Sequence, residues 1–293
     1  MIISAGTSAK GTLFLVATPV GNLEDITLRA LRVLQEADLI ACEDTRQTRK
    51  LLDRHSIHSP LISYHEHNER ERSMELIDRL EQGTNVALVS DAGTPLVSDP
   101  GRDLVRLCIE RHIPVVPIPG PSAFVAALAA SGLSVDEFLF IGFLPPRAGE
   151  RRRRLHALAS ERRTIVLYEA PHRLAQTLAD ALELLGDRDV VLARELTKIH
   201  EEFVRCRLSD LATKYRSQAP RGEITLLIAA PTQGLPQPDA SRVTLAERVR
   251  SLERQGLDRK SALKQAARER GLPKRDAYRQ LLLEEDVTAT RNR

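Results

Sequence analysis

Residues 86–95, VALVSDAGTP, place a short apolar run directly before a turn of small and polar residues. The same arrangement occurs at 13–22, LFLVATPVGN, and at 114–123, PVVPIPGPSA. Each run has the length and composition of a buried strand, so the sequence predicts three strands that end in small-residue turns. In an open parallel sheet, ligands bind outside the carboxyl ends of the strands. Because small residues let the backbone approach a ligand closely, these turns predict one binding crevice built largely from backbone.

The glycine spacing excludes two common nucleotide-binding motifs. No turn has the G-x-G-x-x-G spacing of a dinucleotide-binding fold or the G-x-x-x-x-G-K-[ST] spacing of a P-loop. The turn at 90–95 offers backbone N–H groups, a carboxylate and hydroxyls, which suit a zwitterionic amino-acid moiety. A turn in which Ser90 and Asp91 only cap the following helix is the competing interpretation.

Strand and helix patterns alternate along the chain, which predicts βαβ units and a largely parallel first sheet. The predicted strands of this part are at 12–17, 38–42, 61–64, 86–90, 115–118 and 138–141, and the helices are at 25–36, 45–54, 68–82, 102–111 and 122–130. A break with two prolines and a glycine follows at 144–149. Beyond it we predict a more mixed sheet, with helices at 151–160 and 173–185 and strands at 164–168, 190–194, 203–208 and 224–229.

The predicted fold class is therefore α/β, with two α/β domains and a small C-terminal helical extension. The predicted boundaries are a flexible tail at 1–10, an N-terminal α/β domain at 11–143, a second α/β domain at 144–230, a linker at 231–242, a basic extension at 243–286 and a flexible tail at 287–293. The extension contains helical patterns at 245–255, 259–270 and 274–283, the outline of a helix-turn-helix. A small helical dimerisation or capping element is the competing interpretation.

The charge of the chain is distributed unevenly. The net charge is +3, yet residues 242–283 carry twelve Lys/Arg and only five Asp/Glu. A second basic cluster begins at Arg147 and includes the run RRRR at 151–154. Localised basic surface is typical of proteins that bind a polyanion, and a solvated helix face is the alternative.

Several classes of protein are disfavoured by composition. No apolar run approaches the ~18–20 residues of a membrane span, and the first ten residues lack an apolar h-region. We therefore expect a cytoplasmic protein with no membrane contact. The widely separated Cys42, Cys108 and Cys206 predict reduced thiols. The histidines between 55 and 67 lack a helical His-x-x-x-His pair, so we expect no metal site.

Two charged motifs follow predicted strands, at 43–46 (EDTR) and 169–173 (EAPHR). Functional side chains in α/β folds are concentrated on such loops, and His172 is a candidate general base with a reference pKa of ~6.5. The alternative is that both motifs only begin helices. Acidic residues at a helix start interact favourably with the helix dipole, and Pro171 can simply open a helix.

Taken together, the motifs at 15–23, 42–46, 90–101, 117–123, 140–145 and 168–173 resemble the ribosomal RNA small subunit methyltransferase I family, a branch of the tetrapyrrole methylases. The resemblance covers about residues 11–283. It implies that S-adenosylmethionine binds in the cleft between two α/β domains. It further implies methyl transfer to the ribose 2′-hydroxyl of a cytidine in the decoding region of 16S ribosomal RNA, within the small ribosomal subunit, by a homodimer.

The resemblance also implies site residues, carried over by position. The cofactor-binding residues would be Pro19, Gly21, Asp91, Ala92, Gly93, Pro95, Ser122, Ala123, Tyr168, Glu169 and Ala170. The catalytic candidates are His172, Glu43, Asp44 and Glu169, and the RNA-binding candidates are Arg46, Arg151, Arg152, Arg173, Lys274 and Arg275. Thr94 stands where tetrapyrrole methylases commonly have Asp, which argues against tetrapyrrole chemistry.

Two other functions stay open on the sequence alone. A small-molecule methylase would need a roomy apolar trough for a tetrapyrrole-like substrate and no RNA affinity. A ligand-sensing regulator with a DNA-binding helix-turn-helix would bind a duplex and transfer no methyl group. The acidic and imidazole side chains in the predicted cleft disfavour the regulator, because a sensor needs only shape there.

Overall fold

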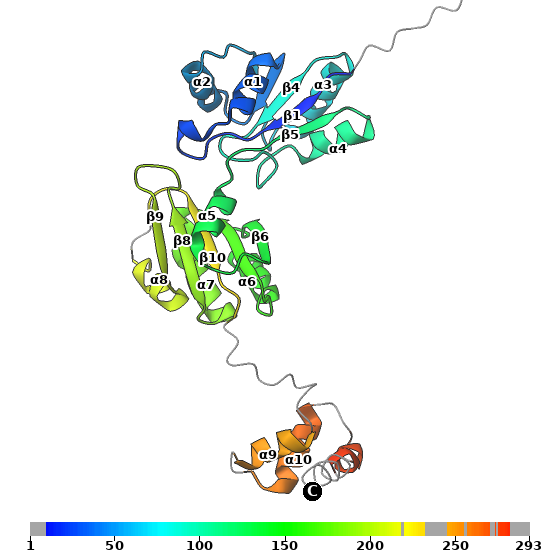
Figure 1. The fold of residues 1–293 in the computed structure, drawn as a ribbon, viewed down its shortest axis with the longest axis vertical. Coiled ribbons are helices and arrows are strands. Elements are labelled where there is room, and N and C mark those ends of the chain that lie inside the picture. The colour runs from blue at the N-terminus through cyan, green and yellow to red at the C-terminus, as the bar shows by residue number, and fades with distance from the viewer. Residues whose placement is uncertain are drawn as a thin grey trace, which may run out of the picture. The chain divides into compact units, whose positions relative to one another are not determined.

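The computed structural model describes residues 10–217, 220–231, 245–254, 257–269, 273 and 275–281. The chain divides into two compact units, Met1–Pro231 and Thr232–Arg293. The first unit contains two five-stranded sheets, and we call each sheet with its helices a lobe (Figure 1). Both predicted tails except residue 10, the predicted linker from 232 onward and Lys274 lie outside the described residues.

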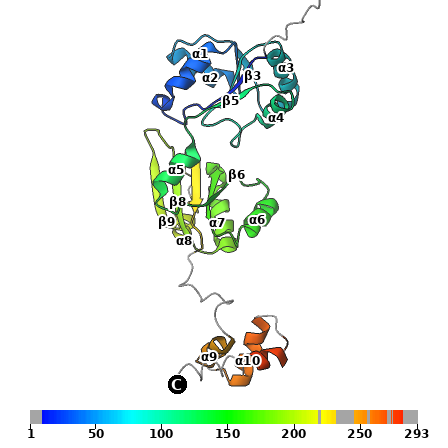
Figure 2. The ribbon, with the colours of Figure 1, turned by 45° about the vertical axis from the view of Figure 1, so that its right-hand side comes forward.

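The first lobe is a parallel sheet with the strand order β3-β2-β4-β1-β5. Its strands are β1 (Leu13–Val16), β2 (Leu39–Cys42), β3 (Leu61–Ser63), β4 (Val86–Val89) and β5 (Val115–Ile118). Its helices are η1 (Leu23–Asp25), α1 (Leu28–Glu36), α2 (Thr45–Arg54), α3 (Glu69–Glu81) and α4 (Arg102–Glu110). Figure 2 shows α1 and α2 on one side of the sheet and α3 and α4 on the other. Every residue of β2 and β4 is buried, as expected of parallel strands that are covered on both faces.

The predicted parallel sheet is thus confirmed. Since β1 lies between β4 and β5, the turns that follow these three strands leave the sheet side by side. One predicted helix differs, because residues 25–36 are split between η1 and α1. Thr27 sets the start of α1, where its hydroxyl accepts a hydrogen bond from the Ala30 N–H at 3.0 Å.

The second lobe is a mixed sheet with the strand order β6-β7-β10-β8-β9, in which β6 and β7 are parallel and the other pairs are antiparallel. Its strands are β6 (Phe138–Phe143), β7 (Thr164–Glu169), β8 (Asp189–Arg194), β9 (Glu202–Arg207) and β10 (Ile224–Ile228). Its helices are α5 (Ala123–Ser131), α6 (Ala148–Ala157), η2 (Pro171–Arg173), α7 (Leu174–Leu185) and α8 (Leu208–Lys214). Strand side chains alternate between faces, so Ile165 and Leu167 pack with α6, α7 and α8, and Val166 packs with α5. The sequence pattern does not predict α8.

The second lobe begins earlier than the sequence predicts. The predicted domain at 11–143 includes α5 and β6, yet β6 pairs with β7 in the second sheet. Ala127 and Leu128 of α5 are buried in the same lobe, against Val166 and Val191. Apolar patterns predict that a strand or helix forms but not which sheet it joins. The predicted boundary after residue 143 therefore falls too late.

The second unit has a small core of its own. It consists of α9 (Leu245–Arg254), α10 (Arg259–Glu269) and helical residues 275–281. Leu252 of α9 is buried with Ala262 of α10 and with Leu281. The carboxylate of Asp258 caps α10 by accepting hydrogen bonds from the N–H groups of two residues, at 3.0 and 3.1 Å. Three helical segments are confirmed, and their helix-turn-helix role stays a prediction.

Two further expectations concern the thiols and the membrane. Cys42, Cys108 and Cys206 are all free. Burial raises the pKa of Cys42, and it raises that of Cys108 to about 11, so both thiols stay protonated and unreactive near neutral pH. Among the described helices, none combines the length and the apolar character needed to cross a membrane.

Candidate functional site

The turns after β1, β4 and β5 are held together by hydrogen bonds. The Thr18 N–H donates to the Gly93 carbonyl at 2.8 Å, and the Gly93 N–H donates to the Thr18 carbonyl at 2.9 Å. The Thr94 hydroxyl donates to the carbonyl of Pro121 at 3.1 Å. Gly93 has a φ of 82°, a left-handed conformation that favours glycine. The three turns therefore converge, as the sequence predicts.

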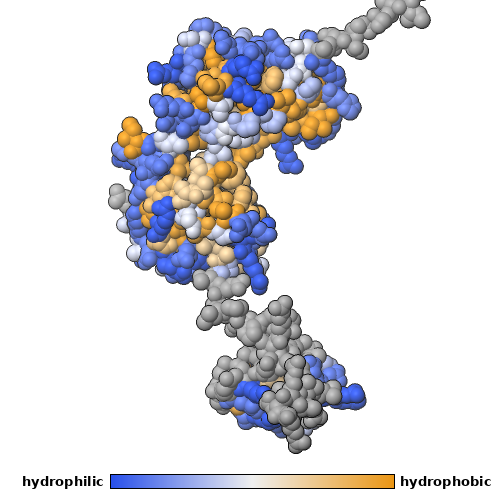
Figure 3. All heavy atoms as spheres, viewed as in Figure 1, coloured by the Kyte–Doolittle hydropathy of each residue, from blue (hydrophilic) through white to orange (hydrophobic). Residues whose placement is uncertain are grey.

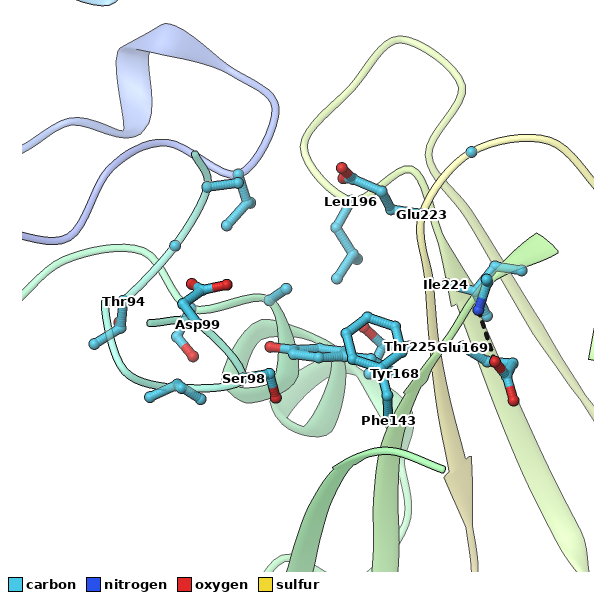
Figure 4. Close-up of a pocket in the computed structure, with 18 of the residues that line it drawn as sticks. Thr94, Ser98, Asp99, Phe143, Tyr168, Glu169, Leu196, Glu223, Ile224 and Thr225 are labelled. Carbon is cyan, nitrogen blue, oxygen red and sulfur yellow. Dashed lines mark hydrogen bonds between the residues drawn. The ribbon is translucent and has the colours of Figure 1, made fainter. Parts of the chain in front are cut away.

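The converging turns form one wall of a cavity of about 370 Å³ in the first unit (Figure 4). The other wall belongs to the second lobe, with side chains from the ends of β6 and β7 and from the loop after β8. Residues from the predicted cofactor set that line it are Ala92, Gly93, Ser122, Ala123, Tyr168, Glu169 and Ala170. Pro19, Gly21 and Asp91 line a neighbouring cavity instead, and Pro95 is buried in the turn.

Asp99 is a cavity residue that sequence reasoning missed. Its carboxylate lies in the cavity, and the hydroxyl end of Tyr168 points toward the same side (Figure 4). Burial, opposed by a hydrogen bond from Ser90 and reinforced by the Glu43 and Asp91 carboxylates, raises the pKa of Asp99 to about 6. The sequence feature that could have indicated Asp99 is a second small-residue stretch, SDPG at 98–101, which is separated by two residues from the turn at 90–95.

The sequence analysis also missed other cavity residues, which lie in segments whose composition does not indicate a functional role. Phe143 ends β6, Leu196 follows β8, and residues 222–225 surround the start of β10. The last two segments meet because β8 and β10 pair antiparallel. An apolar pattern finds each strand, but it does not show which strand end lies beside which. The remaining unassigned lining residues are Val20, Thr94, Val97, Ser98 and Pro171.

Glu169 belongs to a structural network. Its side chain has no exposed surface, and its carboxylate accepts hydrogen bonds from the Ala170 N–H at 2.9 Å and the Thr177 hydroxyl at 2.5 Å. Arg173 Nε lies 3.3 Å from the same carboxylate, and Arg173 donates to two carbonyls at 144–145. Figure 4 shows the carboxylate turned away from the cavity. Glu169 therefore ties the end of β7 to the loop after β6.

The other catalytic candidates have different environments. Asp44 caps α2, and hydrogen bonds from the Arg46 side chain and N–H hold the pKa of Asp44 at about 2. Glu43 is half-buried, and burial raises its pKa with help from Asp91. His172 is exposed in η2 and does not line the cavity. Across the described part of the chain, no three His, Cys, Asp or Glu side chains are grouped so as to hold a metal ion.

Comparison with known proteins agrees with this architecture. Residues 12–212 match the family model of the tetrapyrrole (corrin/porphyrin) methylases. Ribosomal RNA small subunit methyltransferase I from Synechocystis sp. is 50% identical over 275 residues, 94% of this chain and 98% of that protein. The protein of the same name from Thermotoga maritima is 49% identical over 219 residues, 75% of this chain and 98% of that protein.

The chain belongs to the ribosomal RNA small subunit methyltransferase I family. Its fold is also that of the uroporphyrin-III C-methyl transferase from Thermus thermophilus, solved with S-adenyl homocysteine. The two chains superpose with a TM-score of 0.56 at 21% identity, over 74% of this chain and 97% of that one. The family model ends at residue 212, so the second unit of this family member lies beyond it.

The arginines predicted to bind RNA are partly neutralised within this family member. Arg151 has only 4% of its side chain exposed, and its Nε lies 2.8 Å from Asp180. Arg152 pairs with Asp180 at 2.7 Å and also with Glu183. The prediction that Arg151 contacts RNA is corrected by its burial, because α7 supplies carboxylates that a run of arginines in the sequence does not reveal. Arg173 is likewise engaged with Glu169.

Two predicted RNA contacts remain accessible. The Arg46 side chain is 87% exposed although it pairs with Asp44, and Arg275 is exposed in the second unit. Arg153 and Arg154, which share α6 with the paired arginines, are exposed as well. Exposure therefore separates cations that are available to a polyanion from those that brace the fold.

Replacing Arg151 by alanine is expected to destabilise the fold. The nearly buried Asp180 carboxylate loses one of its two guanidinium partners, so the free energy of unfolding should fall by about 2–4 kcal/mol. Arg153→Ala removes an exposed arginine of the same helix and should change it by less than about 0.5 kcal/mol. Urea denaturation measures both, and equal stability of the two variants would contradict the structural role of Arg151.

Proposed function

We propose that this chain is an S-adenosylmethionine-dependent methyltransferase that acts on ribosomal RNA of the small subunit. The proposed target is the ribose 2′-hydroxyl of a cytidine in the decoding region of 16S ribosomal RNA. The observation that carries the proposal is the 370 Å³ cavity walled by three backbone turns, in a chain 50% identical to a relative of that name.

The cavity chemistry fits S-adenosylmethionine, which carries two cationic centres, a carboxylate and an adenine ring. The Asp99 carboxylate complements the cations. The rings of Phe143 and Tyr168, with centroids 5.6 Å apart, offer apolar surface to the adenine. Ser122 and Ala123 stand at the start of α5, where free backbone N–H groups favour a carboxylate.

The bound cofactor would supply an electrophilic methyl group, so the protein has to position the acceptor hydroxyl and take up its proton. Glu43 is the candidate base that its charged surroundings favour; it does not itself line the cavity, but the N–H of its neighbour Asp44 donates to Asp91 at 3.0 Å. The half-buried carboxyl of Glu43 interacts with those of Asp91 and Asp99, and its raised pKa makes it a stronger base than an ordinary Glu. Hydrogen bonds from Arg46 hold the pKa of Asp44 at about 2, which makes Asp44 a weaker base, and the Glu169 carboxylate is turned away from the cavity.

The first experiment supplies labelled S-adenosylmethionine to small ribosomal subunits from cells that lack this protein. We expect label on one cytidine ribose, located by nuclease digestion and mass spectrometry. Label on a base, or on another nucleotide, would contradict the proposed target. Cofactor binding without any RNA label would instead favour a small-molecule methylase. Absence of both would favour the ligand-sensing regulator.

Two variants in the same assay test the base. Glu43→Gln should lower kcat by roughly 100-fold or more, because a positioned base contributes about 10²–10⁴-fold. His172→Ala, at an exposed position outside the cavity, should retain activity within about three-fold. Near wild-type turnover of Glu43→Gln would remove Glu43 from the reaction.

Replacing Asp99 by asparagine should weaken cofactor binding and stabilise the fold. The pKa of Asp99 is about 6 in the folded protein and about 4 in an unfolded chain, so the folded state binds this proton more tightly. The free energy of unfolding of the wild type therefore falls as the pH rises from about 4 to about 6. The variant lacks that loss and should be more stable by about 1–2 kcal/mol at pH ~7.5, with no difference near pH ~4.

Urea denaturation at the two pH values measures the stability of Asp99→Asn, and calorimetric titration measures its affinity for S-adenosylmethionine. An unchanged affinity would place Asp99 outside the cofactor site. If Asp99→Asn were less stable than the wild type at the higher pH, burial of the ionised Asp99 carboxylate would not be destabilising.

We also propose a homodimer. The helix α5, AFVAALAAS, is apolar on all sides, yet Val125 is 51% exposed. The exposed Phe138 lies beside this helix, its ring centroid 6.1 Å from that of Phe124, and Figure 3 shows an apolar area on the second lobe. A helix that is apolar all round is normally buried, so a second copy is the expected cover. Light scattering should give about twice the chain mass of 32.6 kDa, and a monomer at micromolar concentration would contradict the dimer.

A further inference from the structure

A second cavity adjoins the proposed cofactor cavity. Its volume is about 440 Å³, and its walls come from the turn after β1, the first half of α2 and the turn after β4. Val20, Ala92 and Glu223 line both cavities, so the two spaces share a boundary. A molecule in the second cavity would therefore lie directly beside one in the first.

The walls of the second cavity carry hydrogen-bonding groups of several kinds. Asp91 and Glu223 contribute carboxylates, Gln47 an amide and Lys50 an ammonium group. Asp91 is fixed by the Asp44 N–H, which donates to it at 3.0 Å. Carboxylates accept from hydroxyl groups, and an amide both donates and accepts, as recognition of a ribose and a base edge requires.

Lys198 fixes Glu223 from the loop after β8. Its ammonium group donates to Glu223 at 3.0 Å and to Glu195 at 2.9 Å. A Cβ atom at Gly21 would overlap the Lys198 side chain, so glycine there lets this loop close against the turn after β1. The second cavity is therefore framed by both lobes, as the first one is.

A row of cations runs along α2 beside this cavity. Arg46, Lys50 and Arg54 are exposed and recur every fourth residue, which places them on one face of the helix. Lys50 lines the second cavity, and Arg54 lines a larger hollow of about 1010 Å³. This hollow shares Gly21 with the second cavity, so the row follows a continuous depression.

Two cations of α2 are not neutralised by a carboxylate among the described residues. On α3 and α4 the arginines Arg79 and Arg106 form ion pairs with Glu75 and Glu110, at 2.9 Å in each case. Among the described residues, neither Lys50 nor Arg54 has an ion pair; Lys50 donates only to the neutral amide of Gln47, at 3.2 Å. Uncompensated cations beside a polar cavity favour a polyanion that enters the cavity with one of its units.

We propose that the second cavity receives the acceptor nucleotide of a single-stranded RNA segment, and that Lys50 and Arg54 bind the phosphates beside it. The proposal rests on the proposed methyltransferase function and adds where on the protein its RNA substrate binds. A nucleotide that enters a pocket has to be unstacked from its neighbours, and the phosphates on either side then hold the strand in place.

The test of the phosphate contacts uses the full-length protein and small subunits. Lys50→Gln/Arg54→Gln should raise KM for the subunits by roughly 10-fold and lower the salt dependence of log(kcat/KM) by roughly 1.4, two phosphates at ~0.7 each. Its affinity for S-adenosylmethionine should not change. The matched control is Arg106→Gln/Arg111→Gln on the α4 side of the first lobe, which should alter KM by less than about two-fold.

The test of the cavity itself uses Gln47→Leu, which removes no charge. It should raise KM by roughly 3- to 10-fold through the lost hydrogen bonds and leave the salt dependence unchanged. Gln176→Leu, at an exposed position of α7, is the control and should behave as the wild type.

Several results would overturn the proposal. The first is a KM within two-fold of the wild type for the α2 double variant. The second is an equal rise in KM for the α4 control. The third is a loss of cofactor affinity in Gln47→Leu. A wild-type protein that transfers no methyl group to subunits would overturn the proposed function itself, and the site with it; active wild type with unaffected α2 variants would overturn the site alone.

Discussion

The pair of backbone hydrogen bonds between Thr18 and Gly93 is the constraint on which the ligand-binding edge depends. It fixes the turn after β1 to the turn after β4, and Thr94 extends the contact to the turn after β5. Backbone packed this closely leaves little room for bulky side chains, so the turns are built from small residues. Several of the charged groups at this edge therefore come from flanking segments, as Asp99 and Glu223 do.

The first sheet could be predicted from sequence because each of its strands and turns is recognisable from its own short stretch of residues. Buried parallel strands such as β2 and β4 are continuous apolar runs, and the turns that follow them carry glycine and proline. The arrangement of the second lobe depends on which strands pair with one another. The pairing of β6 with β7 and of β8 with β10 is set by packing at long range, so the domain boundary and the contributions of Leu196 and Glu223 were missed.

The sequence also does not show which charged side chains are neutralised in the folded protein. The run at 151–154 is the denser basic cluster in sequence, yet α7 neutralises two of its members through Asp180 and Glu183. The cations of α2 are spread over ten residues and form no continuous basic run in the sequence. Among the described residues, however, Lys50 and Arg54 have no carboxylate opposite them. The electrostatic potential that a polyanion meets depends on this compensation and not on the count of arginines.

The length of the relatives bears on where the substrate binds. An alignment of 219 residues spans 98% of the Thermotoga maritima relative, and the two sheets of this chain alone run from Leu13 to Ile228. A relative of that length has little chain left for a third unit beyond two such lobes. A substrate site shared with this relative would then lie on the lobes, where the proposed α2 site lies. The basic second unit would then add affinity for the same polyanion without supplying the acceptor site.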